Sequence, residues 1–124
     1  MKRREAREKA IQTLFQLDNS EMNVDEAMGY IVETPLDSFY EQLVRGTAEH
    51  LTEIDSEITN KLENWTIDRL PKIERTVLRL AVYELLHNEE VPNRVIMNEA
   101  IELCKTFGDE KSGRFVNGVL SKFQ

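Results

Sequence analysis

Apolar residues recur three or four positions apart along nearly the whole chain, which is the spacing that places side chains on one face of an α-helix. No segment between turn signals shows the sustained alternation of apolar and polar residues that is typical of a half-buried strand. The pattern therefore predicts an all-α fold of about seven helices. The expected helices are residues 3–18, 23–33, 37–50, 52–64, 72–88, 93–107 and 110–122.

Turn-forming residues fall in the gaps of this pattern. Pro92 stands where a helix must stop or start, Asn93 is expected to cap the sixth helix, and Gly108 is expected to end it in the left-handed conformation. In the last helix, Gly113 and Gly118 are expected to let another backbone approach closely. The positions of the turn-forming residues thus agree with the helix ends that the periodicity predicts.

The length of 124 residues suits one compact domain, residues 1–124. There is no internal repeat and no long linker. The segment from Asn64 to Pro71 is expected to divide two packed helical subdomains, approximately residues 1–64 and 65–124.

The fifth expected helix has an unusually broad apolar sector, which is typical of a helix surrounded by others. Glu84 falls inside this sector, so we expect a buried carboxylate that needs hydrogen-bond donors, most simply backbone amides at the start of the sixth helix. Nearer the margins of the sector lie Glu74, Arg75, Arg79 and Tyr83. They are candidates to face a partner.

Charge is unevenly distributed. Residues 1–9 hold five basic and two acidic residues and carry a net charge of +3. Because the whole chain carries −7, the rest of the chain carries −10. The field of such an acidic body repels nucleic acid at long range. Any binding of nucleic acid must therefore be local, and we expect it to be shared with a basic partner.

Arg3, Arg4 and Arg7 continue the apolar sector of the first expected helix. One interpretation is that they pair with carboxylates of a neighbouring helix. The other is that the helix overhangs the core, so that three guanidinium groups project where they can clamp phosphates. The residues alone leave both interpretations open.

The motifs of common catalytic and cofactor sites are absent, including G-x-G-x-x-G, C-x-x-C and H-E-x-x-H. Neither His50 nor His87 has a second histidine or a cysteine at ligand spacing, and Cys104 fits a small core position. We expect no enzyme activity, no cofactor and no metal. No apolar stretch approaches the length of a membrane span and no secretory signal is present, so we expect a cytoplasmic protein.

Two blocks of sequence resemble the NusB family of bacterial transcription antitermination factors. The first comprises residues 3–10 (RREAREKA) and 12–15 (QTLF). The second, longer block comprises residues 73–75 (IER), 78–85 (LRLAVYEL), 91–92 (VP), 98–103 (NEAIEL), 107–108 (FG) and 115–120 (FVNGVL). Residues 19–65 match mainly in length and pattern.

The resemblance implies a protein that binds the boxA element of nascent ribosomal RNA together with NusE, a ribosomal small-subunit protein. NusA, NusG and RNA polymerase would complete the complex. It further implies contacts to single-stranded RNA from Arg3, Arg4, Arg7, Gln12, Lys111 and Phe115, and a NusE-facing surface with Glu74, Arg79 and Tyr83. Phe115 is equally compatible with stacking on a base and with packing in the core.

Two other functions remain open from the sequence. One is a protein-only helical adaptor whose basic end is merely solvated, and the other is an RNA-binding module related to that of a ribosomal RNA methyltransferase. The absence of a cofactor-binding region argues against the second. The sequence is compatible with a monomer and with a homodimer.

Overall fold

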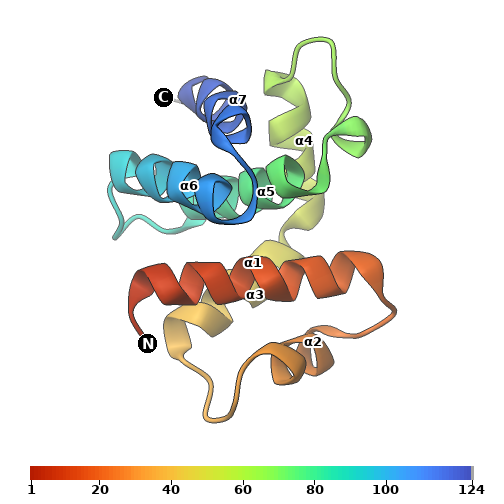
Figure 1. The fold of residues 1–124 in the computed structure, drawn as a ribbon, viewed down its shortest axis with the longest axis vertical. Helices are drawn as coiled ribbons and strands as arrows, with labels where there is room; N and C mark the ends of the chain where they lie inside the picture. The colour runs from red at the N-terminus through yellow and green to blue at the C-terminus, as the bar shows by residue number, and fades with distance from the viewer. Residues whose placement is uncertain (124) are drawn as a thin grey trace. The chain divides into compact units, whose positions relative to one another are not determined.

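The computed structural model describes residues 1–123 and confirms the all-α prediction, because the described residues form helices and no strand. A short 3-10 helix, η1, lies in the segment that was expected to be a connection. The elements are α1 (Arg3–Asn19), α2 (Val24–Ile31), α3 (Ser38–Glu49), α4 (Leu51–Lys61), η1 (Ile67–Arg69), α5 (Lys72–His87), α6 (Asn93–Phe107) and α7 (Glu110–Ser121) (Figure 1).

The chain divides into two compact units, Met1–Glu49 and His50–Gln124. The boundary differs from the expected one near residue 64, because α4 packs on α5 and belongs to the second unit. Ile54 and Ile58 of α4 are fully buried. Their spacing of four residues predicts one buried face, but the helix that covers this face is decided only by the tertiary structure.

In the first unit, α1 packs against both α2 and α3. Ala6, Ala10 and Ile11 of α1 have no exposed surface, and Tyr40 and Leu43 of α3 are equally buried. Small residues on α1 let the larger side chains of α3 approach its backbone. Ala10 and Ile11 of the predicted apolar sector therefore lie in the core of this unit, whereas its other members, Leu14, Phe15 and Leu17, are only half-buried.

In the second unit, α5 packs against α4, α6 and α7, which confirms that it is the central helix. Glu84 is 2% exposed and is buried as predicted, and Cys104 of α6 is a fully buried core residue. The buried residues of α5 are Glu74, Thr76, Val77, Leu78, Leu80, Ala81, Val82, Tyr83 and Glu84.

Three predictions about helix ends and glycines were wrong. Asn93 is the first residue of α6, and Pro92 precedes the helix without a side-chain cap. Gly108 ends α6 at φ −136°, outside the left-handed region; a Cβ there would lie 3.0 Å from Ser112 Oγ and 3.1 Å from Cys104 O, so lack of space favours glycine. Gly113 does face α6, but among residues 1–123 no atom outside the backbone of α7 would lie within 4 Å of a Cβ added at Gly118.

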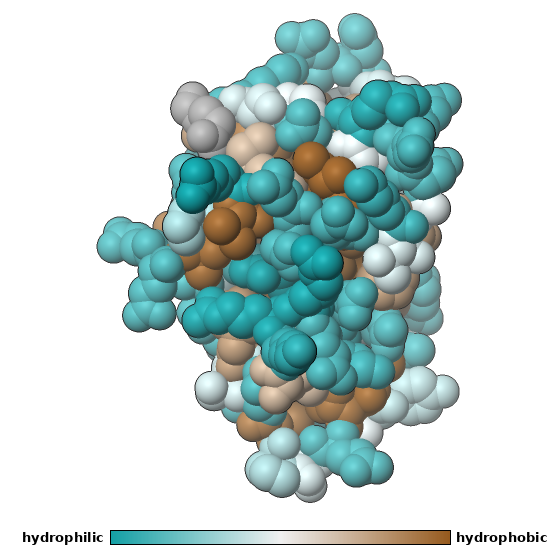
Figure 2. All heavy atoms as spheres, turned by 60° about the vertical axis from the view of Figure 1, so that its left-hand side comes forward, coloured by the Kyte–Doolittle hydropathy of each residue, from teal (hydrophilic) through white to brown (hydrophobic). Residues whose placement is uncertain are grey.

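The face drawn in Figure 2 is covered mainly by hydrophilic side chains, and apolar side chains appear on it in small separate areas. Large exposed apolar residues such as Tyr30 and Trp65 are few among the described residues. None of the described helices combines the length and the hydropathy that crossing a membrane requires.

Candidate nucleic-acid and partner interface

The arginines at the start of α1 differ in accessibility. Arg3 and Arg4 are exposed, whereas Arg7, one turn further on, is only 3% exposed. The expectation that all three guanidinium groups project past the core is therefore wrong for Arg7. Of the three arginines, Arg3 and Arg4 are exposed to solvent at this end of α1, beside the exposed Lys2.

The ring of Phe39, in α3, lies beneath two of these guanidinium groups. The Cζ atom of Arg3 is 4.4 Å from the ring centroid, and that of Arg7 is 5.2 Å away. Arg3 forms no ion pair with a carboxylate of residues 1–123. A guanidinium held over an aromatic face by cation–π attraction keeps its planar N–H donors available at the edge. Phe39 thus orients Arg3 without neutralising it.

Gln12 does not join this arginine end. It is half-buried on α1, nine residues after Arg3. Nine residues turn an α-helix through about 900° and advance it by about 13 Å, so Gln12 points about 180° away from Arg3. The structure therefore separates a residue that the resemblance grouped with the arginines.

Lys111 and Phe115 of α7 line a pocket of about 270 Å³ in the second unit. Phe115 is half-buried, so it packs on its neighbours and still contributes to the pocket wall. The other lining residues are Trp65, Leu70, Pro71, Glu74, Asp109 and Ser112. The pocket combines two aromatic side chains with a lysine and two carboxylates, which suits a flat ligand with polar edges.

Asp109 fixes the end of α7 that carries Lys111. Its Oδ1 accepts hydrogen bonds from the Ser112 backbone N–H at 2.8 Å and from the Ser112 hydroxyl at 3.0 Å. These bonds favour the charged carboxylate and lower the pKa of Asp109. Asp109 is thus an N-cap that holds the first turn of α7 at the rim of the pocket.

Glu74 also lines this pocket from α5. It is 9% exposed, and its Oε2 atom is buried without a hydrogen-bond partner. Burial raises the pKa of the neighbouring Cys104 thiol to about 12, and the charges of Glu74 and Asp109 add to the effect. Cys104 is therefore a protonated core thiol.

Arg79 and Tyr83 occupy a different part of α5. The Nε and second terminal nitrogen of Arg79 donate to the two carboxylate oxygens of Asp55 in α4, each at 2.8 Å. Tyr83 is 5% exposed, and its ring stacks on that of His87 at 5.6 Å. The expectation that Glu74 and Tyr83 lie at exposed margins is wrong, because α5 is covered on more sides than its apolar sector indicated.

Comparison with known proteins adds a decisive observation. The sequence model of the NusB family matches residues 4–124. The chain is 68% identical over 123 residues to the transcription antitermination protein NusB of Lysinibacillus sphaericus (strain C3-41), covering 99% of this chain and 97% of that protein. The chain belongs to the NusB family.

Solved structures extend this similarity to the fold. A solved structure described as T. maritima NusB superposes with a TM-score of 0.89 at 36% identity, covering 98% of this chain and 89% of that one. A crystal structure of the antitermination factors NusB and NusE in complex with dsRNA superposes with a TM-score of 0.86 at 36% identity, covering 97% of this chain and 93% of that one. The NusB likeness therefore includes residues 19–65, where the sequence matched mainly in pattern.

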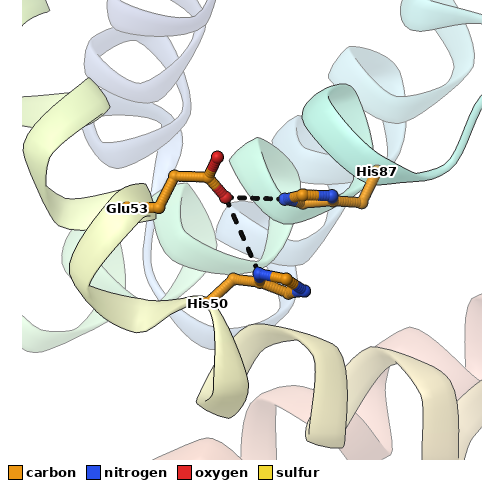
Figure 3. Close-up of side chains that lie close together, drawn as sticks. All are labelled: His50, Glu53 and His87. Atoms are coloured by element: carbon orange, nitrogen blue, oxygen red, sulfur yellow. Dashed lines mark hydrogen bonds and ion pairs between the residues drawn. The ribbon is translucent and has the colours of Figure 1, made fainter.

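Sequence reasoning missed several residues that the NusB fold brings to these surfaces. Phe39 lies more than 30 positions from the arginines that it supports, and Asp55 lies 24 positions from Arg79. His50, Glu53 and His87 also meet, although no ligand spacing links them in the sequence (Figure 3). Helical periodicity reports which face is buried but carries no signal for such partners.

Proposed function

We propose that this chain is an RNA-binding transcription antitermination factor that, with NusE, binds the boxA element of nascent ribosomal RNA and supports read-through by RNA polymerase. Membership of the NusB family carries this proposal. The solved complex of NusB, NusE and dsRNA supports both classes of partner. NusA, NusG and RNA polymerase would complete the assembly, and the cytoplasm is its place of action. The chain acts by binding and not as an enzyme.

The phosphate contacts are assigned to Arg3 and Arg4. Both are exposed at the first turn of α1, and Arg3 is held over Phe39 with its donors at the edge. The chain as a whole carries −7, so it repels a strand except where cations are concentrated. Local contacts of this kind favour weak binding alone and tighter binding beside a basic protein such as NusE.

Arg7 is assigned an indirect part in the same surface. Its guanidinium is 3% exposed and lies over the ring that supports Arg3. Removing it would loosen the packing of α1 on α3 and leave the number of phosphate contacts unchanged. Arg7 is therefore a positioning residue in this proposal.

The pocket beside α7 is assigned to a base and its phosphate. Phe115 offers a ring on which a base stacks, a contact worth about 1 to 3 kcal/mol, and Lys111 is exposed beside it. Gln12 is proposed to meet the strand away from the arginine end, because it points to another side of α1.

The NusE-facing surface is assigned to α5, with Arg79 as its accessible residue; Glu74 and Tyr83 are buried and contribute to this surface only through the packing of α5. Asp55 holds the Arg79 guanidinium in place through two hydrogen bonds, so this part of the surface is ordered before a partner arrives. Preorganisation of this kind lowers the entropy that binding costs.

The arginine assignment is tested by titrating labelled boxA RNA at several salt concentrations in the presence of NusE. Two lost phosphate contacts in an Arg3→Ala, Arg4→Ala double variant should reduce the salt slope by about 1.4, at about 0.7 per contact with a single strand. Arg69 and Arg94 are exposed cations of the second unit. Their double alanine variant removes the same charge and should keep the wild-type slope.

An unchanged slope in the Arg3, Arg4 variant would reject the phosphate assignment. An equal reduction of the salt slope in both double variants would indicate that the overall charge of the protein, and not a contact surface, determines binding. RNA of scrambled sequence is the further control. If the chain is a protein-only adaptor, it should show no preference for boxA RNA with or without NusE. A parallel titration with double-stranded boxA RNA establishes whether the single-stranded or the double-stranded form is bound.

A further inference from the structure

His50, Glu53 and His87 converge at one point of the second unit, as Figure 3 shows. His50 immediately precedes α4, Glu53 lies in the first turn of α4, and His87 is the last residue of α5. Glu53 Oε1 is 2.7 Å from His87 Nε2 and 3.7 Å from His50 Nδ1. Both imidazoles therefore turn a ring nitrogen toward the same carboxylate oxygen.

We propose that His50, Glu53 and His87 form a binding site for a zinc ion. Two neutral imidazoles and one carboxylate are a ligand set that zinc uses where a fourth position is left to water. Bonds of about 2.0 to 2.1 Å in a tetrahedron separate neighbouring ligand atoms by about 3.4 Å. The two distances to Glu53 Oε1 lie on either side of this value, and the three ligand atoms all lie within 4.8 Å of one another.

The ligand types favour zinc over the hard cations. Calcium and magnesium prefer oxygen ligands, whereas imidazole nitrogen suits zinc and related transition metals. The side chains are open to solvent, with His50 42%, Glu53 52% and His87 30% exposed. An ion can therefore enter from solution and keep a water molecule as its fourth ligand.

The two helices that carry the ligands are fixed on each other close to the site. Two hydrogen bonds join Arg79 of α5 to Asp55 of α4, and Ile54 of α4 is fully buried beside Glu53. The His50 and His87 rings stack with centroids 4.1 Å apart, and the buried Tyr83 ring packs on His87. Because the two ring planes are only 20° apart, an ion bound by both imidazoles requires them to rotate out of this stack, while the helices that carry them stay in place.

The same three residues can also form a hydrogen bond between His87 and Glu53 with no ion. The two possibilities differ in what happens when zinc is added. The sequence contains only two histidines, and both lie in this cluster. Their imidazole ¹⁵N resonances therefore report on this site without background from elsewhere in the chain.

The test is a titration of the metal-free full chain with zinc chloride in a non-chelating buffer, followed by imidazole ¹⁵N NMR and calorimetry. We expect one zinc ion per chain, shifts of both imidazoles, and a rise in the thermal unfolding midpoint, because the ion binds the folded state. His50→Gln, Glu53→Gln and His87→Gln should each weaken binding by about tenfold or more.

Two controls keep the outcome specific. Glu57→Gln removes a carboxylate one turn further along α4 and should retain wild-type affinity. Cys104→Ser removes the free thiol, which is buried, and should also leave binding unchanged. Zinc binding that survives His87→Gln, or imidazole resonances unmoved by excess zinc, would overturn the proposal and leave a hydrogen-bonded pair only. No RNA or NusE is present, so the result is independent of the proposed function.

Discussion

A buried pair of hydroxyl groups joins α1 to α3. Thr13 Oγ1 donates its single hydrogen to the Lys9 carbonyl at 2.8 Å and lies 2.5 Å from the Tyr40 hydroxyl. The Tyr40 hydroxyl must therefore be the donor between them. Burial raises the pKa of Tyr40 above its ordinary value of 10.0, so the phenol keeps its proton at neutral pH.

This direction predicts unequal costs for removing the two partners. Tyr40→Phe removes the donor, but Thr13 keeps its bond to Lys9, so the free energy of unfolding should fall by only about 1 kcal/mol. Thr13→Val leaves the fully buried Tyr40 hydroxyl without an acceptor, which should cost about 2 kcal/mol. The lost bond to the Lys9 carbonyl adds little, because such contacts do not stabilise helices.

The double variant distinguishes this account from simple loss of packing. When both hydroxyls are removed, no buried donor is left without an acceptor. The double variant Thr13→Val, Tyr40→Phe should therefore be more stable than Thr13→Val alone, by about 1 kcal/mol. Equilibrium urea unfolding followed by circular dichroism measures all four proteins. A Thr13→Val cost no larger than that of Tyr40→Phe, or costs that simply add, would refute the assigned donor direction.

Two further predictions concern the second unit. Glu84→Ala should lower the free energy of unfolding by about 1 to 3 kcal/mol, because the donors around a carboxylate that is 2% exposed lose their partner. The folded variant should keep its RNA affinity. Glu90→Ala, at an exposed position, is the control, and equal urea midpoints for the two variants would contradict the prediction. Cys104 is fully buried, and burial raises its pKa to about 12. It should therefore react with a thiol reagent at pH 8 only as fast as the chain opens, and mild urea should accelerate the reaction. Rapid labelling of the folded protein would show instead that the thiol is accessible.

The sequence by itself determined the helices and most of the core. Helical spacing of apolar residues indicated all seven α-helices to within a few residues at each end, because burial of one face repeats every turn. The broad sector of α5 indicated its central position, and Glu84 within that sector was correctly predicted to be buried. The family motifs added the partners, which no periodicity contains.

Only the tertiary structure decided which side chains meet across helices. It placed Phe39 beneath Arg3 and buried Arg7, and it brought Glu53 close to both His50 and His87. These contacts depend on how one helix lies against another, and a one-dimensional pattern that fixes the buried face leaves the partner and its register along that face undetermined.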